Sequence, residues 1–123
     1  MLSQAAVMCF VPTKDSARAR AFYEGTLGLH FVSEDAFALV VESAETVIRI
    51  VKIAEFTPAP YTVLGWRVQN IAEQARDLDV RGVAFERFPS MIQDELGIWT
   101  APGGSKVAWF RDPDGNFLSI SQH

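Results

Sequence analysis

Short apolar runs separated by polar turns divide the first half of the chain into a strand, a helix and three further strands. Residues 5–11 are rich in strand-forming residues, and this run stops at Pro12. Asp15 is a suitable N-cap for the helix that follows, and Gly25 is a suitable stop. The apolar stripe of this helix is predicted to contain Ala17, Ala21 and Phe22. Three further runs are strand candidates: 29–33, 37–41 and 46–52.

The second half repeats this order after a proline-rich linker. Residues 55–60 contain the sequence Thr-Pro-Ala-Pro, which extends neither a helix nor a sheet. Residues 61–68 are the next strand candidate, and Asn70 with Glu73 predicts a capped helix. That helix directs three apolar residues inward: Ile71, Ala75 and Leu78. Four more strand candidates complete the chain: 83–87, 98–101, 107–111 and 117–121.

The shared order of the two halves predicts an α+β fold built from two similar modules. Three pairs of residues coincide at an offset of 54: Ala21 with Ala75, Gly28 with Gly82, and Phe31 with Phe85. We expect one domain over residues 1–123, with a first module at 5–54, a linker at 55–60 and a second module at 61–121. Each module puts a helix on one face of a four-stranded sheet. Pairing the two sheets edge to edge gives a curved, cupped mixed sheet with the helices on its outer face, and the cup is the expected site.

Composition and charge narrow the classes of function. The chain has 123 residues, of which 49% are hydrophobic and 21% charged, as in an ordinary folded domain. Its net charge of −4 argues against nucleic acid as a partner, because binding the phosphate backbone requires a basic face. No apolar run reaches the roughly 18 residues of a membrane span, and the N-terminus lacks the basic region of a secretory signal. The single cysteine, Cys9, cannot form an internal disulfide, so we expect a protein of the reducing cytoplasm. We expect no membrane partner.

Two stretches resemble motifs of the vicinal-oxygen-chelate superfamily, which covers glyoxalase I, bleomycin-resistance proteins and extradiol dioxygenases. Residues 15–29, DSARARAFYEGTLGL, are similar to its helix-and-turn signature. Residues 109–116, WFRDPDGN, are similar to its C-terminal hairpin. The resemblance implies paired βαβββ modules, usually in a homodimer, with a ligand cup in the curved sheet. These motifs belong to the scaffold and say little about chemistry.

The same resemblance implies where a metal would be bound. Metal-dependent members place a His, Glu or Gln ligand on the first and last strand of each module, and here those positions hold Met8, Arg49, Val63 and Ser119. A thioether is too soft for a hard or borderline divalent ion, a guanidinium repels it, an isopropyl group has no donor atom, and a lone hydroxyl is weak. We therefore expect no metal and no other cofactor.

Strand alternation predicts the lining of the cup. We expect ligand-binding side chains of three kinds: apolar and aromatic residues, hydroxyls and guanidiniums. The candidates are Met8, Phe10, Arg49, Val63, Arg67, Trp99, Trp109, Phe117 and Ser119. Such a lining suits a flat or aromatic ligand with an anionic group, held by Arg49 or Arg67. Alternatives stay open: Arg49 pairs with Glu42, Glu45 or Glu55, Trp99 seals a dimer interface, and the facing of Trp109 is undetermined.

Several functional hypotheses follow. The favoured one is a metal-independent protein that binds a small organic molecule, like the sequestering bleomycin-resistance branch. The alternative is a metal-dependent lyase or extradiol dioxygenase with unorthodox ligands such as Glu42, Asp35 or His30. A metal-free enzyme with Arg49 as oxyanion stabiliser and a structural module with a self-filled cup are the remaining options. The long connection at residues 88–96 is either a lid or a disordered excursion.

Overall fold

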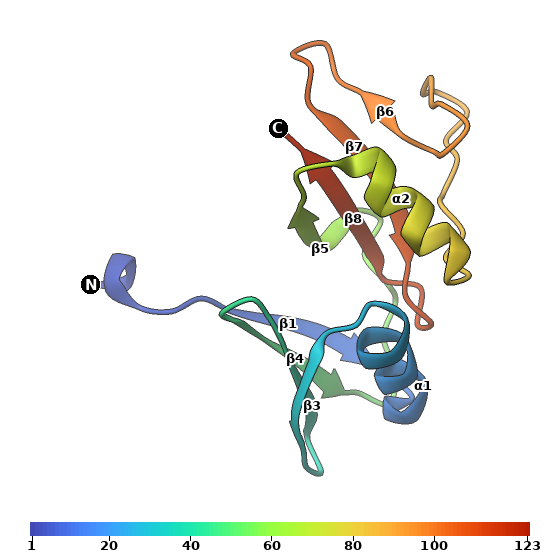
Figure 1. The fold of residues 1–123 in the computed structure, drawn as a ribbon. Helices are drawn as coiled ribbons and strands as arrows, with labels where there is room; N and C mark the ends of the chain where they lie inside the picture. The colour runs from blue at the N-terminus through green and yellow to red at the C-terminus, as the bar shows by residue number, and fades with distance from the viewer. The chain divides into compact units, whose positions relative to one another are not determined.

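The computed structural model describes all residues from 1 to 123 and divides them into two compact units, Met1–Thr57 and Pro58–His123 (Figure 1). The boundary falls inside the predicted linker 55–60. Each unit contains one strand, one helix and three further strands in chain order, so the α+β class and the two βαβββ modules are confirmed. None of the helices has the length and apolar character that a membrane span requires.

The first unit is a four-stranded mixed sheet with one helix. A short 3₁₀ turn, η1 (Leu2–Gln4), precedes β1, and a π-helical turn, η2, continues α1. The main elements are β1 (Met8–Thr13), α1 (Ser16–Arg20), η2 (Ala21–Thr26), β2 (His30–Glu34), β3 (Ala38–Ser43) and β4 (Thr46–Lys52). The strand order is β1-β4-β3-β2, with β1 parallel to β4 and the other pairs antiparallel.

The first helix begins as predicted and ends differently. Asp15 caps it by accepting a hydrogen bond from the Arg18 amide. The predicted stop at Gly25 is wrong, because the chain continues through the π-helical turn and Gly28 takes the left-handed conformation at φ +73°. The predicted apolar stripe is wrong at two of its three positions: Ala17 and Ala21 are exposed, and only Phe22 is half-buried. The buried pair is Ala19 and Tyr23, one turn apart.

The first strand runs past the proline that was expected to end it. Pro12 lies inside β1, opposite Val51 of β4. Because β1 is an edge strand, a missing backbone N–H on its outer side breaks no ladder hydrogen bond. The other confirmed strands lie where they were predicted, with ends displaced by only a residue or two.

The second unit has the same plan. Its elements are β5 (Thr62–Arg67), α2 (Ile71–Val80), β6 (Trp99–Thr100), β7 (Lys106–Arg111) and β8 (Phe117–Gln122). The strand order is β5-β8-β7-β6, again with one parallel pair, β5 and β8. The Asn70 cap is confirmed by its side-chain bond from the Glu73 amide. The strand predicted over 83–87 is wrong: this segment shares only one backbone hydrogen bond with β7, from the Glu86 amide to the Trp109 carbonyl.

Each helix packs on one face of its sheet and leaves the opposite face without a helix. In the second unit α2 lies across β7 and β8 (Figure 1) and buries Ile71, Ala75 and Leu78, as predicted. The buried sheet residues on this side include Leu64, Ala108, Phe110, Leu118 and Ile120. Trp66 belongs to the same layer, because its ring stacks on Phe110 with centroids 6.5 Å apart. The corresponding core of the first unit contains Val11, Leu39, Val41, Ile48 and Ile50. The side chains between these positions point to the helix-free faces.

Candidate functional site in the second sheet

Strand register assigns the helix-free face of the second sheet. Residues directly opposite each other on neighbouring strands share a face. Ser119 lies opposite Gly65 on one side and Trp109 on the other, and Phe117 lies opposite Thr62 and Arg111. The next row holds Arg67, Ser121, Val107 and Trp99. Five predicted site residues therefore share this face: Arg67, Trp99, Trp109, Phe117 and Ser119.

An aromatic pocket of about 160 Å³ opens at one end of this face. Its lining consists of Pro60, Tyr61, Thr62, Phe88, Met91, Trp109 and Phe117. The Phe88 ring stands edge-on to Trp109 with centroids 5.5 Å apart, and lies 6.2 Å from the Phe117 ring. Trp99 extends the cluster, 6.0 Å from Trp109. No charged side chain lines the pocket, so its chemistry is that of aromatic rings, a thioether and two hydroxyls.

A cation outside the pocket fixes one of these rings. The Arg111 guanidinium carbon lies 4.2 Å from the centroid of the Phe117 ring. Its Nε also donates to Glu86 Oε1 at 2.8 Å, so the positive charge is paired. The two contacts hold Arg111 and Phe117 in one mutual orientation, and a cation on an aromatic face adds attraction to the packing.

The connection from 86 to 98 is a tied loop that supplies two walls of the pocket, Phe88 and Met91. The Gln93 amide nitrogen donates to the carbonyls of Glu86 and Gly97, both at 2.9 Å. Its amide oxygen accepts from the Phe88 N–H at 2.8 Å. The Arg87 guanidinium adds bonds to the carbonyls of Asp94 and Glu95, at 2.6 and 2.8 Å. These bonds span the loop from both ends and hold it in a defined conformation.

The sequence prediction missed Tyr61, Phe88 and Met91. Tyr61 was placed inside a strand, and Phe88 and Met91 lie in a loop whose path no periodicity defines. One signal was available: aromatic and thioether side chains in a long polar connection are unusual unless they cover something.

Ser119 forms the floor between the two ends of the face. It is only 9% exposed, and a Cβ atom built on Gly65 would lie 2.8 Å from its Oγ. Any side chain at position 65 would displace the Ser119 hydroxyl, so this position requires glycine. Val63 was predicted to line the cup, but the pairing shifts between Thr62 and Leu64, and Gly65 is the residue opposite Ser119. This β-bulge leaves Val63 without a partner on β8.

The remaining predicted residues lie together on the helix-free face of the first sheet. Met8 is opposite Val47, and Phe10 is opposite Arg49. Met8 and Phe10 are 47% and 61% exposed. Arg49 is half-buried and forms no ion pair, so the expected alternatives with Glu42, Glu45 or Glu55 do not occur.

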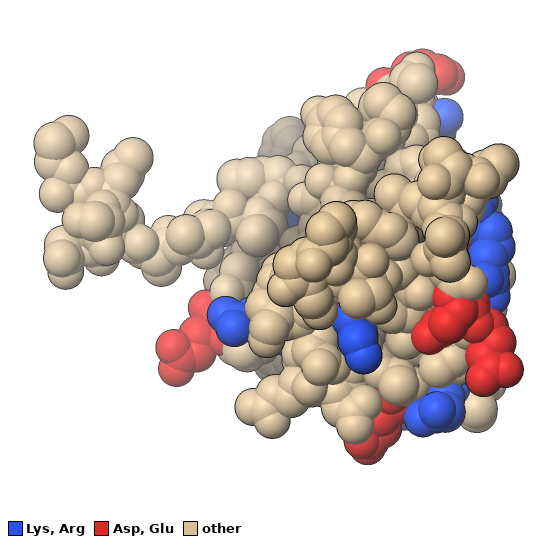
Figure 2. Space-filling model, turned by 90° about the horizontal axis from the view of Figure 1, so that it is seen from above, with Lys and Arg blue, Asp and Glu red and all other residues tan.

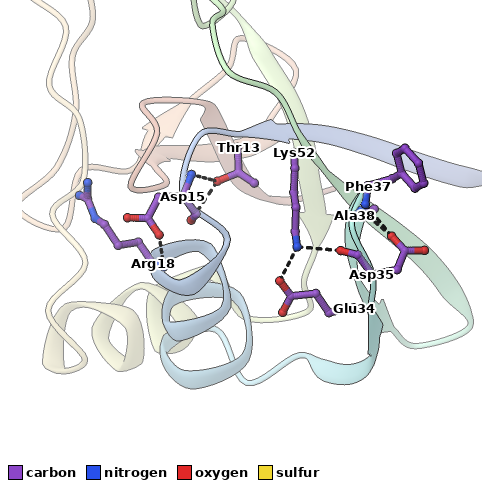
Figure 3. A network of polar contacts seen from close by, with 8 residues as sticks. All are labelled: Thr13, Asp15, Arg18, Glu34, Asp35, Phe37, Ala38 and Lys52. Carbon is purple, nitrogen blue, oxygen red and sulfur yellow. Dashed lines mark hydrogen bonds and ion pairs between the residues drawn. The ribbon is translucent and has the colours of Figure 1, made fainter.

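The charge of Arg49 affects the titration of the Asp35 carboxylate. Amide hydrogen bonds from Phe37 and Ala38 lower the pKa of Asp35 most, and the charge of Arg49 lowers it further (Figure 3). That carboxylate is already engaged by the backbone of its own turn. Arg49 therefore has no ion-pair partner, on a face that it shares with Phe10, Val40 and Glu42.

The donor set does not fit the metal that the fold family implies. Met8 and Arg49 belong to the first unit, and Val63 and Ser119 to the second; none is a His, Glu or Gln. No group of three or more His, Cys, Asp or Glu side chains gathers anywhere in the chain. Of the unorthodox candidates, His30 and Glu42 are opposite each other on β2 and β3. Two donors do not complete a first coordination sphere.

A comparison with models of protein families identifies the family of the chain. Residues 5–120 match the model of the Glyoxalase/Bleomycin resistance protein/Dioxygenase superfamily. The chain belongs to this superfamily. The resemblance seen in the helix-and-turn and hairpin motifs is therefore confirmed. A comparison with curated protein sequences finds none that matches the chain.

Solved structures of the superfamily share the fold across the whole chain. A member from Sphaerobacter thermophilus DSM 20745 has a TM-score of 0.76 at 22% identity, with 100% of both chains covered. A lactoylglutathione lyase from Agrobacterium tumefaciens has a TM-score of 0.74 at 15% identity, covering 97% of this chain and 93% of its own. TnmS3, an antibiotic binding protein from Streptomyces sp. CB03234, has a TM-score of 0.70 at 23% identity, covering 99% and 98%. At these identities the likeness shows the fold, which carries both lyases and binding proteins.

Proposed function

We propose that this superfamily member binds a small aromatic molecule in the aromatic pocket of the second unit, without a metal. The observation that carries the proposal is the set of Phe88, Trp109 and Phe117 rings around an uncharged, solvent-accessible pocket. A planar ligand that binds there displaces water and contacts these aromatic rings on several sides. Tyr61 and Thr62 offer hydroxyls that orient a polar substituent.

Binding is favoured over catalysis by the chemistry of the lining. None of the pocket residues is a His, Asp, Glu, Lys or Cys, so no side chain there is suited to accept a proton near neutral pH. The alternative, a metal-dependent lyase or dioxygenase, needs a ligand set that Met8, Arg49, Val63 and Ser119 do not supply. The sequestering role follows the example of TnmS3, which is described as an antibiotic binding protein.

In the first unit, Arg49 is the proposed contact for a separate anion, with Phe10 opposite it and Met8 on the same face. Its guanidinium is half-buried among apolar neighbours and has no ion-pair partner. A planar fork of N–H donors in that setting pairs well with a carboxylate or phosphate. Val63, displaced by the bulge, contributes at most an apolar contact.

The proposed assembly is a homodimer in the cytoplasm, with edge strand β1 as the contact. Val7, Met8 and Phe10 are 72%, 47% and 61% exposed along this strand and just before it. Residues 1–7 carry no charge and are exposed throughout, and they project from the strand in Figure 2. Light scattering after gel filtration tests this: a mass of twice 13.6 kDa supports the dimer, and a mass of 13.6 kDa contradicts it.

Calorimetric titration with 2-naphthol tests the pocket. Tyr61→Ala removes an aromatic wall whose residue is 66% exposed, and Phe37→Ala removes an equally exposed aromatic residue, at 74%, from the first unit. We expect Tyr61→Ala to weaken naphthol binding about fivefold, because a ring contact contributes about 1 kcal/mol. Phe37→Ala should leave the affinity unchanged. Equal affinities in both variants, or no binding by the unmodified protein, would overturn the proposal.

A further inference from the structure

The end of the second sheet away from the aromatic pocket carries a cation and three polar side chains. Arg67 on β5 lies directly opposite Ser121 on β8, on the helix-free face. His123 follows β8, with Nε2 3.1 Å from Ser121 Oγ and Nδ1 3.2 Å from Ser105 Oγ. Both ring nitrogens of His123 are thus engaged by hydroxyls, which fixes the ring beside Arg67.

A pocket of about 430 Å³ opens beside Arg67, where β5 and β8 end. Its lining consists of Arg67, Val68, Gln69, Gln122 and His123, with no acidic side chain among them. Arg67 is exposed and forms neither an ion pair nor a side-chain hydrogen bond. By contrast, the guanidiniums of Arg87 and Arg111 on the same unit are satisfied by carbonyls and a carboxylate. The Arg67 guanidinium at the edge of this pocket therefore has all its N–H donors free.

Between this pocket and the aromatic pocket, the helix-free face of β5 and β8 carries only small side chains. Phe117 and Ser121 both point to the helix-free face and are four residues apart on β8, about 13 Å along the strand. Between them lies the row of Gly65 and Ser119, which has no side chain on β5 and a single hydroxymethyl group on β8. On β5 and β8 this row has no bulky side chain in the path of a chain of methylene groups, and Trp109 of β7 lies next to that path.

We propose that Arg67, with His123 and Ser121, forms a carboxylate subsite that extends the aromatic pocket. The ligand class is then an elongated aromatic carboxylate: its ring lies among Phe88, Trp109 and Phe117, its chain crosses Gly65 and Ser119, and its carboxylate pairs with Arg67. The pairing is bidentate, because the guanidinium presents two parallel N–H groups to a planar carboxylate. This inference rests on the proposed function of the aromatic pocket.

Two probes that differ only in their terminal group, a carboxylate or an alcohol, test the subsite. These are 6-(2-naphthyloxy)hexanoate and 6-(2-naphthyloxy)hexan-1-ol, titrated calorimetrically at low ionic strength. We expect the carboxylate to bind about tenfold more tightly than the alcohol. Arg67→Gln should abolish that preference by lowering the carboxylate's affinity to that of the alcohol. Arg76→Gln, which removes another exposed and unpaired arginine, from α2, is the matched control and should keep the preference.

The outcomes separate the subsite from the pocket. If the two probes bind equally, and Tyr61→Ala weakens both, the subsite is overturned and the aromatic pocket stands. If the preference survives in Arg67→Gln but is lost in Arg49→Gln, the anion binds in the first unit and the assignment to Arg67 is wrong. If neither probe binds the unmodified protein, the proposed function fails and the subsite fails with it.

Discussion

The Phe88 ring stands at 87° to the Trp109 ring, with centroids 5.5 Å apart. This contact joins a loop residue to a residue of β7, and it sets one wall of the aromatic pocket against another. The Phe88 backbone is itself held, because its N–H donates to the Gln93 side chain. The pocket therefore depends on loop hydrogen bonds as much as on the sheet, which leads to the first prediction.

Replacing Gln93 should destabilise the loop and, as a result, lower the affinity of the aromatic pocket for its ligand. Gln93→Ala removes three hydrogen bonds and leaves two carbonyls and one N–H of the loop without their partner. We expect a loss of about 1–3 kcal/mol in the free energy of unfolding, measured by urea denaturation, and weaker binding of 2-naphthol. Ile92→Ser, at a neighbouring residue that is 93% exposed, should change neither. Wild-type stability and affinity in Gln93→Ala would show that the loop does not need this side chain.

Because Gly65 and Ser119 approach closely, we predict that substitutions at these two positions have coupled effects on stability. In Gly65→Ala the new methyl group meets Ser119 Oγ at 2.8 Å and the Ser119 carbonyl oxygen at 3.4 Å. We expect a destabilisation of about 1–3 kcal/mol, because the neighbouring strand must shift or the hydroxyl must rotate away.

Ser119→Ala should relieve part of this cost. A double-mutant cycle by urea denaturation should give a favourable coupling of about 1 kcal/mol between the two substitutions. Strict additivity would mean that the backbone, and not the hydroxyl, limits the space at Gly65.

Glu34 and Lys52 give the first unit a pH-dependent contribution to stability. Lys52 Nζ lies 2.8 Å from Glu34 and also donates to the Asp35 carbonyl (Figure 3). Chiefly through the Lys52 hydrogen bond, the pKa of Glu34 is lowered from its ordinary value of 4.5. A lowered pKa in the folded state stabilises the protein above the unfolded-state pKa, and this contribution is lost as the pH falls through the folded-state pKa.

Glu34→Gln should therefore be less stable than the unmodified protein at pH 7. The difference should shrink as the pH falls below about 4.5. Thermal unfolding followed between pH 7 and pH 3 measures it. Glu55→Gln, which removes an exposed carboxylate without an ion pair, is the control. A difference for Glu34→Gln that grows toward low pH would contradict the sign of this linkage.

Local chemistry made much of the scaffold predictable. Asp15 and Asn70 are caps because their side chains accept an amide hydrogen bond three residues on, and this needs only local sequence. The spacing of Ile71, Ala75 and Leu78 places them on one side of a helix wherever the helix packs. Strand alternation likewise put Phe117 and Ser119 on one face, because a regular strand has period two.

The errors arose where tertiary context decides. A π-helical turn after Arg20 shifts the end of the first helix from Gly25 to beyond Thr26, and no local residue announces it. The bulge at Val63 moves Gly65 beside Ser119, because pairing with β8 sets the register. Phe88 and Met91 reach the pocket through a loop fixed by Gln93, whose partners lie four to seven residues away.

The central claim is that an aromatic molecule binds against Trp109, and fluorine NMR of the 5-fluorotryptophan-labelled protein tests it most directly. The chain has three tryptophans: Trp66 packs on Phe110 in the helix-covered layer, and Trp99 and Trp109 lie on the helix-free face. During titration with 2-naphthol, the Trp109 resonance, assigned by Trp109→Phe, should shift saturably, Trp99 should shift less, and Trp66 should stay in place. A Trp109 resonance that does not move while naphthol binds, or a shift confined to Trp66, would contradict the account.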